Sequence, residues 1–312
     1  MTASHPHISV VIPVYRSAAT LRELCRRLRA VLEPLTTAYE VILVNDASPD
    51  ESWQVLCALH AHEPGIKAID LARNFGQHAA LLCGLAHAQG DVVITMDDDL
   101  QHPPEELPVL INALTRAPDV DVVIGAYTVK QHSWFRNLGT AVIHWATSRI
   151  FNKDPRLRLT SFRILRRSVV EQVLRFSTDS PRIGQIILMT TNRICNVPVR
   201  HAPRAQGRSG YTFARLCKDF LDNVLGNSTL PLSFVIYLGF GSAAMSFLLL
   251  AWIVYKKFVR GISVQGWTTI MVLLLFMFGM LFLSLGIIGE YLIRILREAK
   301  KNPQYVVREA ML

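Results

Sequence analysis

Short apolar runs alternate with longer amphipathic segments from Ile8 to Ala126. The runs predict strands, and the segments between them predict helices: strands at Ile8–Val14, Glu40–Val44, Lys67–Leu71, Val92–Met96 and Val120–Ala126, and helices at about Ala18–Leu35, Glu51–His62 and Gln77–Gln89, with another beginning at Pro104. Near-continuous apolar strands alternating with helices are typical of a parallel sheet covered on both faces. We therefore expect an α/β fold, Rossmann-like, with a mainly parallel sheet.

Two later runs contain no charged residue, Pro231–Tyr255 and Trp267–Gly289. Each is long enough to cross a hydrocarbon core, which takes about 20 apolar residues. We expect a transmembrane hairpin of two helices. Met1–His7 is polar and does not resemble a signal peptide, so the N-terminal domain is expected to stay in the cytoplasm.

The charges that flank these runs only partly support this topology. The basic residues after the second run follow the positive-inside tendency, whereas those between the runs oppose it: Arg294, Arg297, Lys300 and Lys301 against Lys256, Lys257 and Arg260. A hairpin returns the C-terminal tail to the side of the N-terminal domain.

Ser133–Phe151 and Tyr211–Leu225 have the pattern of amphipathic helices with cationic flanks. Such helices lie in a membrane interface or pack on a protein core, and the pattern alone does not decide between the two. The expected organisation is a nucleotide-sugar-binding core at 1–132, an acceptor-side region at 133–227, the transmembrane hairpin at 228–292 and a cytoplasmic tail at 293–312.

Composition excludes several other classes of protein. The net charge is +9, but no nucleic-acid recognition motif accompanies it, so anionic lipid and a phosphorylated substrate are the expected partners. The five cysteines form no CxxC pair and are expected to be reduced thiols. Neither GxGxxG nor GxxxxGK[ST] occurs, which argues against the usual dinucleotide and P-loop sites.

Polar residues follow three of the predicted strands, at Tyr15, at Asp46 and at Asp97–Asp99. Ligands of open α/β sheets bind beyond the carboxyl ends of the strands, so these residues mark a candidate site. Three successive carboxylates repel one another unless a cation or water screens them. Hard oxygen ligands favour Mg²⁺ or Mn²⁺ shared with substrate phosphates, and the alternative is a solvated acidic loop that caps the helix at Pro104.

At these motifs the chain becomes recognisable. It resembles the inverting GT-A glycosyltransferases that act on polyprenyl phosphate, and among them the bacterial undecaprenyl-phosphate transferases of formamido-arabinose, glucose or mannose. The matching segments span most of the chain: Val10–Tyr15, Tyr39–Ser48, Arg73–His78, Asp97–Glu105, Ser133–Arg136, Ser161–Arg163 and Gly289–Ile295.

The resemblance implies transfer of a sugar from a UDP- or GDP-linked donor to undecaprenyl phosphate, with inversion. It places the protein in the bacterial inner membrane, as a multi-pass protein whose catalytic domain faces the cytoplasm. The product would serve cell-envelope glycan or lipid A (lipopolysaccharide) modification. A homo-oligomer such as a tetramer is also implied.

The resemblance further implies roles for individual residues. The catalytic set is Asp97, Asp99, Arg136 and Arg163, and the metal ligands are Asp97, Asp99 and Gln101. The substrate-binding set comprises Pro13, Tyr15 and Asp46 for the base and ribose, together with Gly76, Gln77, Asp98, Ser161, Arg204, Arg208 and Ser209. Gly210 stands where relatives usually carry a lysine, and an arginine usual near Tyr127 is missing.

The acceptor of this reaction is a phosphate monoester, whose second pKa is about 6, so it is largely dianionic at neutral pH. No general base is therefore assigned. Two other readings stay open. A processive polysaccharide synthase would carry QxxRW and more spans, and QxxRW does not occur in the chain. A catalytically inactive membrane adaptor would retain the fold for binding.

Overall fold

The computed structural model describes residues 8–36, 38–127, 157–176, 181–200, 202, 266–299 and 303–312, and single residues between Tyr237 and Val259. The chain divides into two units, Met1–Ser209 with Lys301–Leu312, and Gly210–Lys300. The two expected amphipathic helices lie outside the described residues, and the first expected span is described only at single positions.

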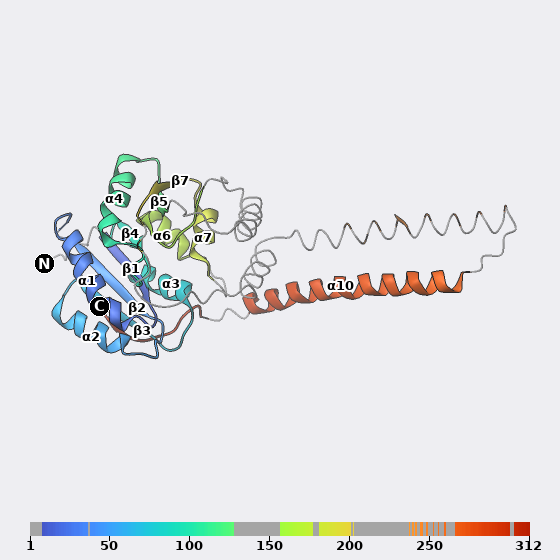
Figure 1. Cartoon of the computed structure of the whole chain (residues 1–312), viewed down its shortest axis with the longest axis horizontal. Helices are drawn as coiled ribbons and strands as arrows, with labels where there is room; N and C mark the ends of the chain where they lie inside the picture. The colour runs from blue at the N-terminus through green and yellow to red at the C-terminus, as the bar shows by residue number, and fades with distance from the viewer. Residues whose placement is uncertain are drawn as a thin grey trace. The chain divides into compact units, whose positions relative to one another are not determined.

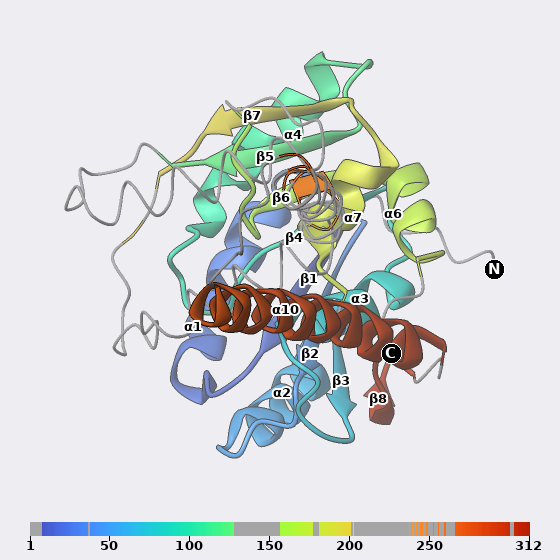
Figure 2. The same ribbon diagram turned by 90° about the vertical axis from the view of Figure 1, so that its right-hand side faces the viewer.

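The first unit is built on one eight-stranded sheet with the order β7-β5-β6-β4-β1-β2-β3-β8 (Figures 1 and 2). The strands are β1 (Ile8–Val14), β2 (Tyr39–Asn45), β3 (Ile66–Leu71), β4 (Val92–Thr95), β5 (Val122–Ala126), β6 (Arg163–Arg166), β7 (Ile194–Pro198) and β8 (Val307–Met311). The central strands β4, β1, β2 and β3 are parallel, as the sequence predicts.

The sheet as a whole is mixed, with parallel pairing also between β5 and β7. Strand β6 pairs antiparallel with both β4 and β5, and β8 pairs antiparallel with β3. Neither β6 nor β8 was predicted, and these two strands supply all the antiparallel pairings. Because β6 and β7 join the same sheet, that sheet extends beyond residue 132, where the first expected region ends.

Helices cover both faces of the sheet (Figure 1). They are α1 (Ala18–Leu32), α2 (Ser52–His62), α3 (Gln77–His87), the short 3₁₀ turn η1 (Pro104–Glu106), α4 (Leu107–Arg116), α6 (Arg167–Val173) and α7 (Ile183–Thr190). One apolar cluster joins α1, α2 and α4 to the sheet, and another joins α3, α6 and α7 to it.

Alternation along β1 shows how the two clusters arise. Val10 and Ile12 belong to the first cluster and Val11 to the second, because successive side chains of a strand point to opposite faces. All seven residues of β1 are buried because both faces of the strand are covered, and all but Ser9 are apolar.

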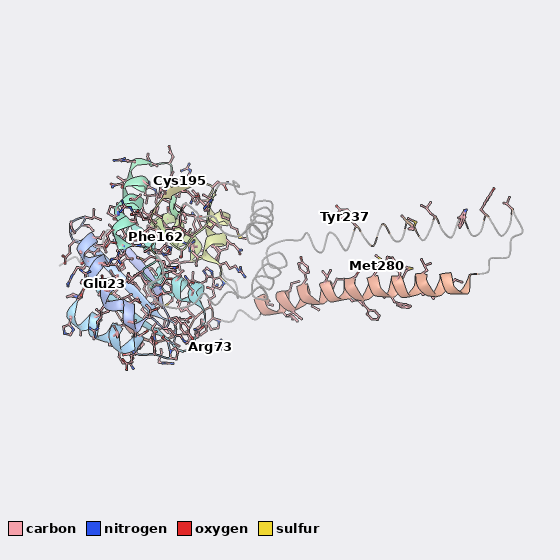
Figure 3. The ribbon with its side chains drawn as sticks, viewed as in Figure 1. Glu23, Arg73, Phe162, Cys195, Tyr237 and Met280 are labelled. Carbon is pink, nitrogen blue, oxygen red and sulfur yellow. The ribbon has the colours of Figure 1, made fainter. Side chains whose placement is uncertain are left out.

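The second unit contains one long described helix, α10 (Trp267–Ala299). Its segment Phe276–Ile293 is long and apolar enough to cross a membrane, and it is the one such segment among the described residues. Apolar side chains project from the helix, Met280 among them (Figure 3), and Phe282 is 68% exposed. The segment 293–312, which is expected to form the tail, contains the end of α10 and the strand β8.

Close packing of α3 on the sheet predicts a stability effect at Gly84. A Cβ added there would lie 2.3 Å from Cγ1 of Val11 and 3.2 Å from Cγ2 of Val44. We expect Gly84→Ala to lower the free energy of unfolding by about 1–2 kcal/mol, because overpacking outweighs the better helix propensity of alanine. Thermal unfolding of the full chain in detergent measures the effect.

Gly65→Ala is the matched control, since a Cβ at Gly65 would meet nothing closer than 3.7 Å. It should stay within about 1 kcal/mol of the wild type. Equal stability of both variants would contradict the close contact between α3 and β1.

Candidate functional site

The candidate site lies at the carboxyl ends of β2, β1 and β4. These strands are adjacent and parallel, with Val14 of β1 paired to Asn45 of β2. Residues that follow them therefore emerge at one edge of the sheet, as ligand sites of open α/β sheets require. Tyr15, Asp46 and Asp97–Asp99 all meet this condition.

Asp46 organises the loop that leads into α3. Its carboxylate is 2% exposed, and its two oxygens accept hydrogen bonds from the backbone N–H groups of Phe75 (2.7 Å) and Gly76 (2.8 Å). Burial raises the pKa of Asp46, and these two backbone donors oppose the rise. Gly76 has φ +93°, a conformation that L side chains rarely adopt, so glycine is needed where this loop meets the carboxylate.

Asp97 is held from two directions. Its Oδ1 accepts a hydrogen bond from Nε2 of Gln77 (2.6 Å), and its Oδ2 accepts one from the hydroxyl of Ser161 (2.6 Å). Three residues predicted for the site thus meet, although they come from α3, from the end of β4 and from the segment before β6.

Arg163 lies beneath this arrangement. It is 2% exposed, and its Nε donates to Oγ1 of Thr95 (3.1 Å), while that hydroxyl donates to the backbone carbonyl of Ser161 (2.6 Å). Burial lowers the pKa of Arg163 to about 10, and the charge of Asp97 opposes this decrease. The described geometry makes Arg163 a support for Ser161 and Asp97; its expected role at the phosphates stays a prediction.

Asp98 contacts the loop after β1. One oxygen of its carboxylate accepts hydrogen bonds from the backbone N–H of Tyr15 (3.1 Å) and from the hydroxyl of Ser17. Burial raises its pKa to about 6, and the charges of Asp97 and Asp99 add to the rise. Asp98 therefore links the acidic turn to the segment that presents Tyr15.

Asp99 and Gln101 form a tight turn. Oδ1 of Asp99 accepts a hydrogen bond from the backbone N–H of Gln101 (3.1 Å), as in Asx turns, and Leu100 between them has φ +60°. The carbonyl of Gln101 accepts a hydrogen bond from the N–H of Ala202 (3.0 Å), a residue that shortly precedes Arg204 in the chain.

At the strand ends, Pro13 and Tyr15 differ in exposure. Pro13 is buried within β1, whereas the ring of Tyr15 is 43% exposed. The guanidinium of Arg16 lies 5.3 Å from the centre of that ring, and Arg16 has φ +57°. An exposed aromatic ring at a ligand-binding edge offers a surface on which a nucleobase can stack.

His102 was not singled out from the sequence, although it lies within the Asp97–Glu105 motif. It is 4% exposed, and its ring is nearly parallel to those of Tyr127 and Phe162, with ring centres 5.5 and 5.2 Å away; Phe162 is labelled in Figure 3. Its Nε2 is hydrogen bonded to the Tyr127 hydroxyl, and its Nδ1 lies 3.8 Å from Oδ2 of Asp97. Burial, followed by the charge of Asp97, raises the pKa of Tyr127.

A metal site here would have few protein ligands. No group of three His, Cys, Asp or Glu side chains in the described part of the chain is arranged to hold a metal ion. The expected ligands Asp97 and Asp99 supply two carboxylates, and each oxygen that accepts one hydrogen bond keeps a second lone pair for a cation. Such a pair fits Mg²⁺ or Mn²⁺, which usually takes one or two carboxylates and completes its shell with water and substrate phosphates.

Four expected site residues, Arg136, Arg204, Arg208 and Ser209, lie outside the described residues. The others that the structure brings together are Tyr15, Asp46, Gly76, Gln77, Asp97, Asp98 and Ser161, linked by the contacts given above.

The acidic turn follows β4, next to β1, where the order of the strands in the sheet reverses. This is the arrangement of GT-A glycosyltransferases. The chain belongs to glycosyl transferase family 2, whose model matches residues 9–174. It is 34% identical over 305 residues to undecaprenyl-phosphate 4-deoxy-4-formamido-L-arabinose transferase of Sodalis glossinidius (strain morsitans), covering 96% of this chain and 93% of that protein.

Solved structures agree on the fold. Glucosyl-3-phosphoglycerate synthase from Mycobacterium tuberculosis, in complex with Mn²⁺, uridine diphosphate and phosphoglyceric acid, superimposes with a TM-score of 0.55 at 17% identity. The match covers 72% of this chain and 79% of that one. A complex of the same enzyme with phosphoglyceric acid gives a TM-score of 0.53 at 18% identity, over 72% and 80% of the two chains.

The contacts of Asp98 generate a prediction on donor binding. Asp98→Ala removes the acceptor that holds Tyr15 and Ser17, so we expect the KM for the sugar donor to rise about tenfold, since hydrogen bonds to charged groups contribute about 1.5–3 kcal/mol. Asp98→Asn keeps an acceptor oxygen and should have the smaller effect. Steady-state kinetics with varied donor measures both, and circular dichroism checks the fold. An unchanged donor KM in Asp98→Ala would show that Asp98 does not position this loop.

Proposed function

We propose that the protein transfers a sugar from a nucleotide-linked donor to a polyprenyl phosphate, with inversion, at the cytoplasmic face of a bacterial inner membrane. The observation that carries the proposal is Asp97, held by Gln77 and Ser161 beside the Asp99–Gln101 turn at the carboxyl edge of the sheet. The name of the 34% identical relative supports undecaprenyl phosphate as the acceptor, and we propose envelope modification as the purpose.

The donor would be a UDP- or GDP-linked sugar. Tyr15 is exposed at the edge and offers its ring to the base, and Asp46 sets the neighbouring loop through Phe75 and Gly76. Asp97, Asp99 and Gln101 would hold Mg²⁺ or Mn²⁺ together with the diphosphate. The structural neighbour solved with Mn²⁺ and uridine diphosphate supports this assignment.

In the proposed reaction an oxygen of the acceptor phosphate attacks the anomeric carbon of the sugar. The bond from that carbon to the donor diphosphate breaks, and the nucleoside diphosphate leaves with the electron pair. Direct displacement from the opposite face inverts the anomeric centre. The acceptor dianion needs no strong base. A bound divalent cation would supply stabilisation of the negative charge that grows on the leaving diphosphate.

The residues of this chain have distinct tasks in that scheme. Gln77 and Ser161 fix the orientation of the Asp97 carboxylate before substrate arrives. Such preorganised groups are more effective than groups that must reorient during the reaction. Arg163 is buried behind Asp97 and partly balances the carboxylates, which limits their mutual repulsion when no cation is present.

Membrane attachment follows from α10 and from the return of the chain to the sheet. The strand β8 follows α10 in sequence and pairs with β3 of the same sheet that β1 begins. The two ends of the membrane segment therefore belong to one domain on one side, so the number of crossings is even. With α10 as one crossing, we infer that the uncharged run Pro231–Tyr255 supplies the other.

The direct test uses the full chain in detergent with undecaprenyl phosphate, Mn²⁺ or Mg²⁺ and a panel of UDP- and GDP-sugars. We expect one donor to yield nucleoside diphosphate and glycolipid only when metal is present. Asp99→Asn should lower turnover about 100-fold, because loss of a ligand should cost at least as much as the roughly 10–100-fold typical of residues that only support metal ligands. Asp119→Asn is the matched control, because Asp119 is exposed before β5.

Absence of both turnover and donor binding across the panel would contradict the transferase and favour the inactive adaptor. Turnover that is equal without metal, or unchanged in Asp99→Asn, would instead refute the metal assignment alone.

The membrane topology has its own test. A fluorescent protein fused after Leu312 should fluoresce in bacterial cells, because an even number of crossings keeps the C-terminus in the cytoplasm. Alkaline phosphatase fused after Arg260, between the two uncharged runs, should be active because it is exported. An inactive phosphatase at this position would argue against the hairpin.

A further inference from the structure

The strand β8 closes the β3 edge of the sheet and comes from the far end of the chain (Figure 2). It pairs antiparallel with β3, from Ala68 with Met311 to Leu71 with Val307, with a shift of register between Asp70 and Leu71. Ala72 N–H also donates to the carbonyl of Val306 (2.8 Å). The sequence between α10 and β8 is short, so β8 is the first part of the sheet after the membrane helix.

Arg308 of this strand reaches a buried carboxylate in β3. Its Nη1 lies 3.1 Å from Oδ2 of Asp70, and its Nη2 donates to the carbonyl of Ala72 (2.7 Å). Asp70 is 2% exposed, whereas the side chain of Arg308 is 59% exposed. A buried carboxylate needs donors for its oxygens, because an unpaired buried charge is costly.

The other oxygen of Asp70 faces the end of β2. Oδ1 of Asp70 accepts a hydrogen bond from Nδ2 of Asn45 (2.7 Å), and Asn45 is itself 2% exposed. Asn45 is the last residue of β2 and directly precedes Asp46. One carboxylate therefore joins the C-terminal strand to the strand end that enters the candidate site.

Hydrogen bonds of Asn45 and Ser48 extend this connection to the loop at Tyr15. Oδ1 of Asn45 accepts a hydrogen bond from the N–H of Ser48 (3.3 Å), across Ala47, which has φ +47°. The hydroxyl of Ser48 in turn accepts one from the N–H of Arg16 (2.7 Å). Described contacts thus run without interruption from Arg308 to the residue next to Tyr15.

We propose that Arg308 and Asp70 are positioning residues for the donor nucleotide. In this proposal β8 contributes to donor binding by holding the edge of the sheet at which the donor binds. The proposal rests on the proposed function, in that it takes the edge at Tyr15 and Asp46 as the nucleotide pocket. Neither residue touches the donor. The ion pair orients the amide of Asn45, and this amide shapes the Ala47–Ser48 turn that abuts the pocket.

The alternative role for Arg308 is simple fastening of an edge strand. Fastening predicts lower stability without a selective change in donor affinity. Positioning predicts a selective loss of donor affinity that does not depend on a loss of stability. The two roles therefore separate in measurements that compare donor binding, acceptor KM and thermal unfolding of the same variants.

The experiment compares Arg308→Gln, Arg308→Lys, Asp70→Asn and the double variant in the full chain. We expect Arg308→Gln to raise the donor KM about tenfold, because Asp70 loses its charged partner and the amide of Asn45 is freed to reorient. The KM for undecaprenyl phosphate should stay within about twofold. Arg308→Lys keeps the charge and should recover part of the loss.

The double variant should be less impaired than the sum of the single variants predicts, because it leaves no unpaired buried charge. Arg116→Gln is the matched control, because it makes the same change at an exposed arginine in the last turn of α4, away from β8. It should leave both KM values unchanged.

Titration of nucleoside diphosphate and Mn²⁺ into the wild type and Arg308→Gln gives a readout that does not need turnover. Binding to the wild type that weakens about tenfold in Arg308→Gln supports positioning even if no sugar is transferred, so failure of the proposed function stays distinguishable. Equal nucleotide affinity with a lower melting temperature would overturn the proposal in favour of fastening. A selective rise in the acceptor KM would overturn it as well.

Discussion

The arrangement of this domain depends on placing four carboxylates at one edge of a sheet without mutual repulsion dominating. Asp46 and Asp97–Asp99 emerge there because β1, β2 and β4 are adjacent and parallel. Each carboxylate accepts from a different set of donors. The donors are backbone N–H groups for Asp46, side chains for Asp97, a mixed pair for Asp98 and a turn N–H for Asp99. Dividing the donors in this way gives each carboxylate a separate direction and task.

That division explains why the middle carboxylate is tolerated. Asp98 directs one oxygen toward Tyr15 and Ser17, whereas Asp97 accepts from Gln77 and Ser161, so the two adjacent carboxylates point to different partners. The ionised form of Asp98 is disfavoured by burial and by the adjacent charges, which raise its pKa to about 6. Arg163, buried behind Asp97, supplies compensating positive charge from inside the sheet. A buried arginine in this position holds strand β6 and the acidic turn together through Thr95 and Ser161.

The predictable part of the fold is the part with strong periodicity. Strand β1 was predicted with its observed limits, because both of its faces are buried and every residue is apolar or small. Strand β8 reads Val-Arg-Glu-Ala-Met and was missed, since an edge strand exposes much of its surface and needs no apolar run. Strand β6 was missed because it is short and has arginine at both ends, one of them buried against all expectation for that residue type.

The residues of the site, like the strands, were predictable where the sequence carries a local pattern and not where they depend on long-range pairing. The sequence indicated the strand ends and the acidic run, and resemblance to a family added Gln77 and Ser161, which the structure brings to Asp97. Residues that act through long-range pairing left no such signal. His102 gains its environment from Tyr127 and Phe162, far along the chain, and Arg308 meets Asp70 only because β8 returns to β3. That return makes α10 part of an insertion between two strands of a single sheet. Removal of the chain from α10 onward would therefore also remove β8 and leave this edge of β3 unpaired.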